Sequence, residues 1–300
     1  MRISGLYAAL ATPVGDTGHI DLDGVDRLCD FVLARGAPGI CLGGATSEYP
    51  RFETADRLAV LRRVTRRLPP DVPLVVAIGA SSIERTLDLG RAAFDEGSRA
   101  VLVPMPWFFA YEQDDLAAYA AHVGRALPGP CLLYDLPEFT TALAADTILD
   151  LLAGGQAAGI KDSSGGAERL ERFASARGAR DWSLLAGDDR CGLAAARAGW
   201  DGAVSGLACC CPELLVALRE SIARGDAAEA ERYQSLVNEL AARVGRLPAP
   251  WGVRVALAAR GCDIGPTALP PSPRRAAAIA DLAAWLPPWL DAAGIPGLRR

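Results

Sequence analysis

Short apolar runs alternate with longer amphipathic segments from the N-terminus to about Gly225, and this alternation restricts the fold of the chain more than any other feature. The runs are apolar throughout, which is typical of parallel strands that are covered on both faces. The eight candidate strands are Tyr7–Ala11, Gly39–Leu42, Leu74–Ile78, Ala100–Val103, Cys131–Tyr134, Ala157–Ile160, Ser183–Leu185 and Gly202–Ser205.

Segments with a helical period follow these runs. In one of them, the apolar residues Leu58, Leu61, Val64 and Leu68 recur on one face. Eight parallel strands, each followed by a helix, predict an α/β fold of the (β/α)8 TIM-barrel type over residues 1–224. A doubly wound open sheet is the alternative, but no Gly-x-Gly-x-x-Gly motif follows the first strand. The candidate helices are Leu22–Ala34, Thr54–Arg67, Ile83–Glu96, Asp114–Ala126, Ala144–Ala153, Ala167–Ala176, Cys191–Ala198 and Pro212–Ala223.

The alternation stops after Gly225, and no apolar strand run occurs beyond it. Three helical patterns cover Asp226–Arg246, Trp251–Ala259 and Arg274–Ala293, with prolines between them. Residues 225–300 are therefore predicted to form an all-helical C-terminal extension of the barrel.

Charge and cysteine content exclude several classes of function. A net charge of −5 and a pI near 5.2 argue against a nucleic-acid partner. We expect a cytoplasmic protein with no membrane partner, because no signal peptide or spanning segment is evident. The eight cysteines form no Cys-x-x-Cys pair, and the adjacent Cys209, Cys210 and Cys211 cannot converge on one tetrahedral ion. We expect no metal site.

Lys161 is the only lysine among the 31 lysine and arginine residues of the chain. Arginine can pair with carboxylates, but its guanidinium stays protonated and cannot attack a ketone, whereas lysine can. A single retained lysine indicates an amine that does covalent work, most simply a Schiff base with a carbonyl substrate. Drift from lysine to arginine, with one accidental survivor, is the competing explanation.

The residues with chemical potential follow the predicted strands. In a barrel, the carboxyl ends of the strands share one face, where catalysis takes place. Tyr134 and Lys161 end neighbouring strands, and a phenol can both donate and accept a proton; alternatively, Tyr134 is a core aromatic with a solvated hydroxyl. The other candidates on this rim, all predicted to bind substrate, are Thr12, Gly44, Ala45, Thr46, Gly187, Ser205 and Gly206.

The loop Gly44-Ala45-Thr46 combines backbone N–H groups with a hydroxyl. Such a loop can hold the carboxylate of a 2-oxo acid. An ordinary turn between a strand and a helix is the alternative. The loop alone therefore does not predict a carboxylate site, and it does so only in combination with Lys161.

Together these motifs resemble the dihydrodipicolinate synthase and N-acetylneuraminate lyase family of class I pyruvate-dependent aldolases. The resemblance covers nearly the whole chain and implies a homotetramer, as a dimer of dimers, or a homodimer. It implies that Lys161 is the Schiff-base lysine, in Ile160-Lys161-Asp162-Ser163-Ser164-Gly165. Tyr134-Asp135-Leu136-Pro137 is similar to the family's Tyr-Asn-x-Pro, whose tyrosine carries protons. Gly44-Ala45-Thr46-Ser47-Glu48 is similar to the Gly-Thr-Thr-Gly-Glu loop that holds the pyruvyl carboxylate.

Several positions depart from the dihydrodipicolinate synthase pattern, among them Asp135 in place of the asparagine and Ser47 in place of the glycine, which are milder changes. Phe139 stands where the synthases have an arginine that grips the second substrate. Pro106-Trp107-Phe108 replaces a Pro-Tyr-Tyr stretch whose tyrosine crosses the subunit interface, and Ala45 replaces a relay threonine. The changes make condensation with aspartate semialdehyde a disfavoured reaction. Trp107, Phe108 and Phe139 are predicted to bind a less charged aldehyde end.

We therefore expect a lyase or aldolase that acts on pyruvate or another 2-oxo acid through a Lys161 iminium, without a cofactor. Three alternatives stay open: a dehydratase of 2-keto-3-deoxy sugar acids, a 4-hydroxy-tetrahydrodipicolinate synthase, and a non-catalytic barrel that binds 2-oxo acids. A barrel that binds phosphorylated substrates or flavin is a fourth and less favoured alternative.

Overall fold

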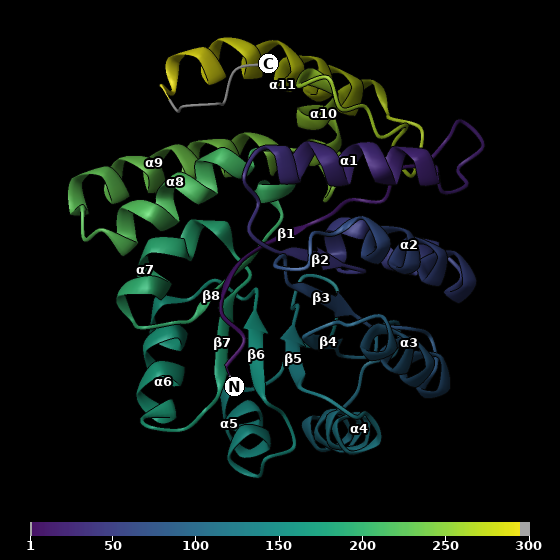
Figure 1. Ribbon diagram of the computed structural model, residues 1–300, viewed down its shortest axis with the longest axis vertical. Coiled ribbons are helices and arrows are strands. Elements are labelled where there is room, and N and C mark those ends of the chain that lie inside the picture. The colour runs from purple at the N-terminus through teal and green to yellow at the C-terminus, as the bar shows by residue number, and fades with distance from the viewer. Residues whose placement is uncertain (1, 295–300) are drawn as a thin grey trace.

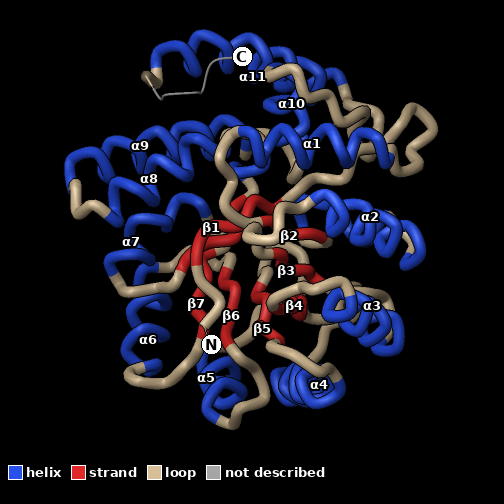
Figure 2. Tube along the Cα trace, viewed as in Figure 1, coloured by secondary structure: helices blue, strands red, loops and turns tan. Residues whose placement is uncertain are grey.

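The computed structural model describes residues 2–294, in which eight parallel strands close into a barrel. The strands pair in chain order, and β8 pairs with β1. Figure 2 shows them at the centre of the molecule with helices around them. The predicted barrel is confirmed, and the doubly wound alternative is wrong. The strands are β1 (Gly5–Ala9), β2 (Ile40–Leu42), β3 (Leu74–Ala77), β4 (Ala100–Pro104), β5 (Cys131–Asp135), β6 (Gly159–Asp162), β7 (Ser183–Ala186) and β8 (Gly202–Ser205).

A helix follows each strand, and three more helices follow α8. Short 3-10 turns lie between strand and helix after β2, β7 and β8: η1 (Ala45–Ser47) with η2 (Tyr49–Arg51), η3 (Asp189–Cys191) and η4 (Leu207–Cys209). The α-helices are α1 (Leu22–Ala34), α2 (Thr54–Arg67), α3 (Ile83–Asp95), α4 (Gln113–Ala126), α5 (Ala145–Ala153), α6 (Ala167–Arg177), α7 (Gly192–Arg197), α8 (Pro212–Ala223), α9 (Ala227–Val244), α10 (Trp251–Ala259) and α11 (Pro273–Ala292).

Two strands lie two residues away from their predicted positions, at both ends. β1 begins at Gly5 rather than Tyr7, because Gly5 and Leu6 pair with the first residues of β8. β6 runs through Lys161 to Asp162 rather than ending at Ile160. In this register Lys161 lies directly beside Tyr134 of β5.

The barrel separates two apolar cores. One fills the space between the outer barrel wall and the helices. The other lies inside the barrel, where Tyr7, Leu102, Leu132 and Leu185 pack together with Tyr134. Since side chains alternate between the two faces of a strand, residues of one parity point inward. This alternation brings Tyr134 to the inner face, at the carboxyl end of its strand.

The C-terminal helices α9, α10 and α11 pack on the side of the barrel where α1 and α8 lie (Figure 1). α9 runs beside α8, and α10 and α11 lie together beyond α1 (Figure 1). Arg254 of α10 is 3% exposed and donates to the backbone oxygens of Thr12 and Ile264. Within residues 2–294, no helix combines the length and apolar composition needed to cross a bilayer.

Candidate active site

Lys161 and Tyr134 lie together on adjacent strands at the inner face of the barrel. The Lys161 Nζ is 4.0 Å from the centre of the Tyr134 ring. Both side chains are buried, at 5% and 1% exposure. The phenol of Tyr134 is thus close enough to the amine to exchange protons with a group bound there.

Arg169 of α6 fixes the two catalytic strands from the outer side of the barrel. Its Nε donates to Asp162 Oδ2 at 2.8 Å, and its other nitrogens bond Asp135 and the Leu143 carbonyl. Asp135 and Asp162 directly follow Tyr134 and Lys161, so these pairs hold β5 and β6 together next to the two residues. Asp162 is thus a structural acceptor, as its place in the strand predicts. Burial raises the pKa of Asp135, and Arg169 opposes this shift.

Gly187, which follows β7, leaves room for the lysine side chain. A Cβ at this position would lie 2.9 Å from Lys161 Cε and 2.1 Å from Ser163 Oγ. Any larger residue would displace the amine. Gly187 therefore shapes the lysine environment rather than holding substrate through a side chain.

The loop after β2 is held by Ser47, which stands where the family pattern has glycine. Ser47 Oγ donates to the Leu10 carbonyl at 2.6 Å and accepts from the Gly43 N–H at 3.0 Å. Within the described chain, the Thr46 hydroxyl bonds no other residue, and it faces the cavity. The loop is rigid on its outer side and has a free hydroxyl on its inner side.

Glu48 connects this loop to the C-terminal helices. Its carboxylate accepts from Arg254 at 2.6 Å and from Arg51 at 3.1 Å. Arg254 also bonds the Thr12 carbonyl at 2.8 Å. Buried, multiply bonded ion pairs position the groups they join. The helical extension is therefore part of the site and not a detached appendage.

A cavity of about 270 Å³ opens at this rim and is lined by both Lys161 and Tyr134. We call Lys161, Tyr134 and Thr46 the lysine end of the cavity. We call the apolar residues of its lining the distal end. Its residues come from the β5–α5 loop, from η4 and from the α9–α10 region: Leu136, Phe139, Leu207, Ala241, Val244, Leu247, Ala249, Pro250 and Val253.

Several predicted substrate residues line the cavity with the lysine: Ala45, Thr46, Phe139, Gly187 and Gly206. Two others lie next to it. Gly44 lies beside Tyr134, since a Cβ on this glycine would be in ordinary contact with the Tyr134 hydroxyl, at 3.8 Å. Ser205 is 1% exposed and accepts from the Ala208 N–H, which makes it a support of the β8 turn.

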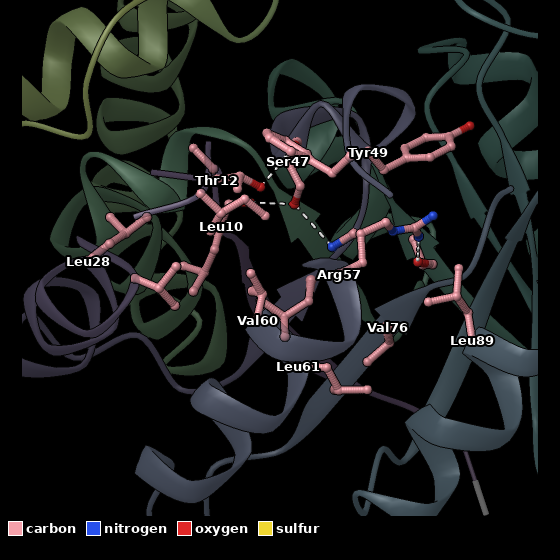
Figure 3. Close-up of a pocket in the computed structure, with 17 residues that line it drawn as sticks. Leu10, Thr12, Leu28, Ser47, Tyr49, Arg57, Val60, Leu61, Val76 and Leu89 are labelled. Carbon is pink, nitrogen blue, oxygen red and sulfur yellow. Dashed lines mark hydrogen bonds between the residues drawn. The ribbon is translucent and has the colours of Figure 1, made fainter. Parts of the chain in front are cut away.

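Thr12 lies outside the cavity, because its hydroxyl donates to the Ser47 carbonyl at 2.8 Å. It lines a separate gap of about 40 Å³ on the outer side of the barrel, with Leu28, Leu61 and Arg57 (Figure 3). Figure 3 shows Thr12 and Ser47 bonded at one edge of this gap. The gap is too small for a substrate. In this structure the Thr12 hydroxyl supports the loop after β2.

Trp107 and Phe108 do not line the cavity within one chain. The Trp107 ring packs edge-on against Tyr49, with centroids 5.3 Å apart. Phe108 is 91% exposed and has a φ of 80°, and its ring contacts Phe109 at 5.0 Å. Of the three aromatic residues predicted to bind the aldehyde end, only Phe139 lines this cavity within one chain. The other two lie on the β4–α4 loop.

Asp189, two residues beyond the predicted Gly187, was not predicted from the sequence as a site residue. Asp189 lines the cavity and accepts from the Leu207 N–H at 3.1 Å. Burial raises its pKa to about 6, and a hydrogen bond from Ser205 opposes the shift. Asp188 has a different partner, since it pairs with Arg190 through both carboxylate oxygens, at 2.9 and 2.7 Å.

The apolar residues of the α9–α10 region were also missed. They are 80 or more residues from the lysine in sequence, and no motif marks them. Among the described residues, no group of His, Cys, Asp and Glu side chains is arranged to hold a metal ion. Cys209 is fully buried, and burial raises the pKa of its thiol to about 12.

Comparison with known proteins identifies the family. The model of the Dihydrodipicolinate synthetase family matches residues 2–280. The chain belongs to this family. The 4-hydroxy-tetrahydrodipicolinate synthase of Sorangium cellulosum (strain So ce56) is 32% identical over 264 residues, which are 87% of each chain. Synthase 1 of Streptomyces coelicolor (strain ATCC BAA-471 / A3(2) / M145) is 31% identical over 267 residues, 87% of this chain and 86% of the relative.

Solved structures share the same fold. Ruminococcus gnavus sialic acid aldolase superposes with a TM-score of 0.85 at 21% identity, over 96% of this chain and 98% of that one. Dihydrodipicolinate synthase from Aquifex aeolicus superposes with a TM-score of 0.88 at 20% identity, over 98% of this chain and 100% of that one. Family members are pyruvate-dependent Schiff-base lyases and aldolases, so the expected enzyme class, a carbon–carbon lyase of class I type, is confirmed.

Proposed function

We propose that this family member cleaves or forms the C3–C4 bond of a 2-oxo acid through an iminium on Lys161. One observation carries the proposal: the buried Lys161 amine lies 4.0 Å from the Tyr134 ring at the mouth of the barrel. An amine beside a proton carrier is the minimum that Schiff-base chemistry needs.

In the cleavage direction, the Lys161 amine adds to the C2 ketone of a 4-hydroxy-2-oxo acid, and loss of water gives the iminium. A base then takes the 4-hydroxyl proton, the C3–C4 bond breaks, and its electron pair forms an enamine while the aldehyde leaves. C3 is protonated, and water hydrolyses the second iminium to release pyruvate and the free amine. Tyr134 is the proton carrier, and Thr46 and the loop amides hold the carboxylate.

No cofactor takes part in this proposal, because the protonated imine itself accepts the electron pair. The reaction needs an amine, a proton carrier and a carboxylate site. The lysine end supplies one residue or loop for each of these.

We favour an aldolase or lyase over a 4-hydroxy-tetrahydrodipicolinate synthase. Phe139 lies in the cavity where the synthase pattern has its gripping arginine, and Ala45 brings no hydroxyl. A dehydratase shares the iminium and differs only in the bond that breaks next.

The proposed assembly is a homotetramer or a homodimer of a cytoplasmic protein. Phe108 and Phe109, at 91% and 65% exposure, give the β4–α4 loop an apolar surface that a second copy could cover. Sedimentation equilibrium tests this part, and a monomer at micromolar concentration would contradict it.

A panel of 4-hydroxy-2-oxo acids with product detection by mass tests the reaction. Release of pyruvate and an aldehyde supports the proposal. Water loss with retention of all carbons indicates the dehydratase, and binding without any product indicates the non-catalytic barrel. Efficient condensation of pyruvate with aspartate semialdehyde would indicate the synthase.

A further inference from the structure

We propose that the distal end of the cavity binds an apolar, uncharged group, so that the substrates are 2-oxo acids with an alkyl or aromatic tail. This inference rests on the proposed function, since it concerns the part of the substrate beyond the iminium. It differs from the expectation drawn from Trp107 and Phe108, which lie elsewhere.

The first argument is the composition of the distal walls. Val244, Leu247 and Val253 of the C-terminal region line the cavity, and none of these side chains can form a hydrogen bond. Phe139 lies at the rim, 46% exposed, and presents a ring where a tail would leave the barrel. Walls of this kind favour apolar area by about 25 cal/mol per Å² removed from water.

The second argument is the state of the cations. Besides Lys161, Arg190 is the only cationic residue among those described as lining the cavity. Arg190 is already bound by both oxygens of Asp188. A second substrate carboxylate would therefore find no free cation, and leaving such a charge unpaired is costly.

The third argument is the sign of the remaining charges. Glu138 lines the rim, and Asp189 lies deeper, held by Leu207 N–H. Both carboxyls disfavour an anionic tail. The charged groups of the lining beyond Lys161 are thus the paired Arg190 and carboxylates, and neither suits a second substrate carboxylate.

The tail preference can be measured without turnover, because the single lysine can be trapped with borohydride. Equimolar 2-oxo-4-phenylbutanoate and 2-oxoglutarate, which differ only in phenyl against carboxylate, compete for Lys161, and intact mass gives the ratio of the two reduced adducts. Protein unfolded in guanidinium gives the baseline ratio, since its lysine is equally open to both acids. We expect the folded protein to favour the phenyl adduct by roughly tenfold over this baseline.

A charge placed at the rim should reverse the preference. Phe139→Arg is expected to lower the phenyl-to-carboxylate ratio about tenfold, by supplying the missing cation. Leu269→Arg adds the same charge at a 67% exposed residue that does not line the cavity, so it should leave the ratio unchanged. Phe139 is itself exposed enough for its variant to fold.

The outcomes separate the two proposals. Suppose that pyruvate forms an adduct, but the phenyl-to-carboxylate adduct ratio equals the baseline or favours 2-oxoglutarate. This result would contradict the proposal that the distal end binds an apolar group, and the proposed Schiff-base function would still stand. If pyruvate gives no adduct on the folded protein, the proposed function fails and the inference fails with it.

Discussion

The two ends of the cavity are built in opposite ways. The lysine end consists of Lys161 and Tyr134 on adjacent strands and Thr46 on the loop after β2, and buried hydrogen bonds of Arg169 and Ser47 hold the residues next to them. The distal end consists of apolar side chains from the C-terminal region, η4 and a loop. Chemistry common to a family needs rigid polar groups, whereas substrate preference can change through apolar residues that make no hydrogen bonds. In our proposal, the lysine end carries out the reaction and the distal end determines its selectivity.

The largest expected effect comes from removing the amine at the lysine end. Lys161→Arg keeps the charge but cannot form an imine, so turnover should fall by at least about 10⁴-fold. Steady-state assay of pyruvate release measures this, and circular dichroism checks the fold. Turnover within tenfold of the wild type would remove the lysine from the mechanism.

Arg169→Leu tests how the lysine end is held. The variant leaves Asp135 and Asp162 buried without their cation, and breaking a buried pair in this way costs about 3–5 kcal/mol. Chemical denaturation measures the loss. Arg172→Leu is the matched control, since its pair with Asp146 lies at the surface and should contribute about 0–1 kcal/mol. Equal losses in both variants would contradict this role of Arg169.

Tyr134→Phe separates proton transfer from imine formation. The ring stays in place, so packing is kept, but turnover should fall about 10²–10⁴-fold. Borohydride trapping of pyruvate should still give an adduct, though more slowly. An unchanged kcat would show that another group, such as Asp189, carries the proton.

Substitution of Asp189 is expected to have the smallest effect, a change in stability that depends on pH. Burial raises its pKa from 3.8 to about 6, so the folded state binds more protons than the unfolded state between these values. Stability therefore falls as pH rises from about 4 to about 6, and the loss persists above that range. Asp189→Asn removes this cost and should stabilise the protein at pH 7.5 by on the order of 1–2 kcal/mol, less at pH 4.5. Thermal unfolding at both pH values measures the difference, and a larger gain at pH 4.5 would contradict the assignment.

The sequence was enough to predict the barrel because periodicity is a local property. Several helices, among them α1, α2 and α10, have the predicted boundaries, since their amphipathic patterns end at glycine, proline or a polar turn. β1 was placed two residues late, because its pairing with β8 depends on residues about 200 positions away. Local patterns do not contain such partners.

The lysine end could be predicted from the sequence because short local motifs mark its residues. No such motif marks the residues of the distal end. Lys161, Tyr134 and the Gly44–Glu48 loop form short motifs on known rim positions. Leu247 and Val253 resemble any other apolar residue of a helical region, and only the fold brings them to the cavity. Thr12 was misplaced because its strand end is on the rim, but its hydroxyl is used by the Ser47 carbonyl.

The central claim is that Lys161 carries the covalent intermediate, and borohydride trapping with peptide mapping tests it most directly. Trypsin cleaves after Arg125, Lys161 and Arg169, and a reduced adduct blocks the cut at Lys161. Incubation with pyruvate and borohydride should give the uncut peptide 126–169, heavier by one reduced pyruvyl group, and Lys161→Arg should give no adduct. Cleavage at an unmodified Lys161, after complete reaction with pyruvate under turnover conditions, would contradict the account.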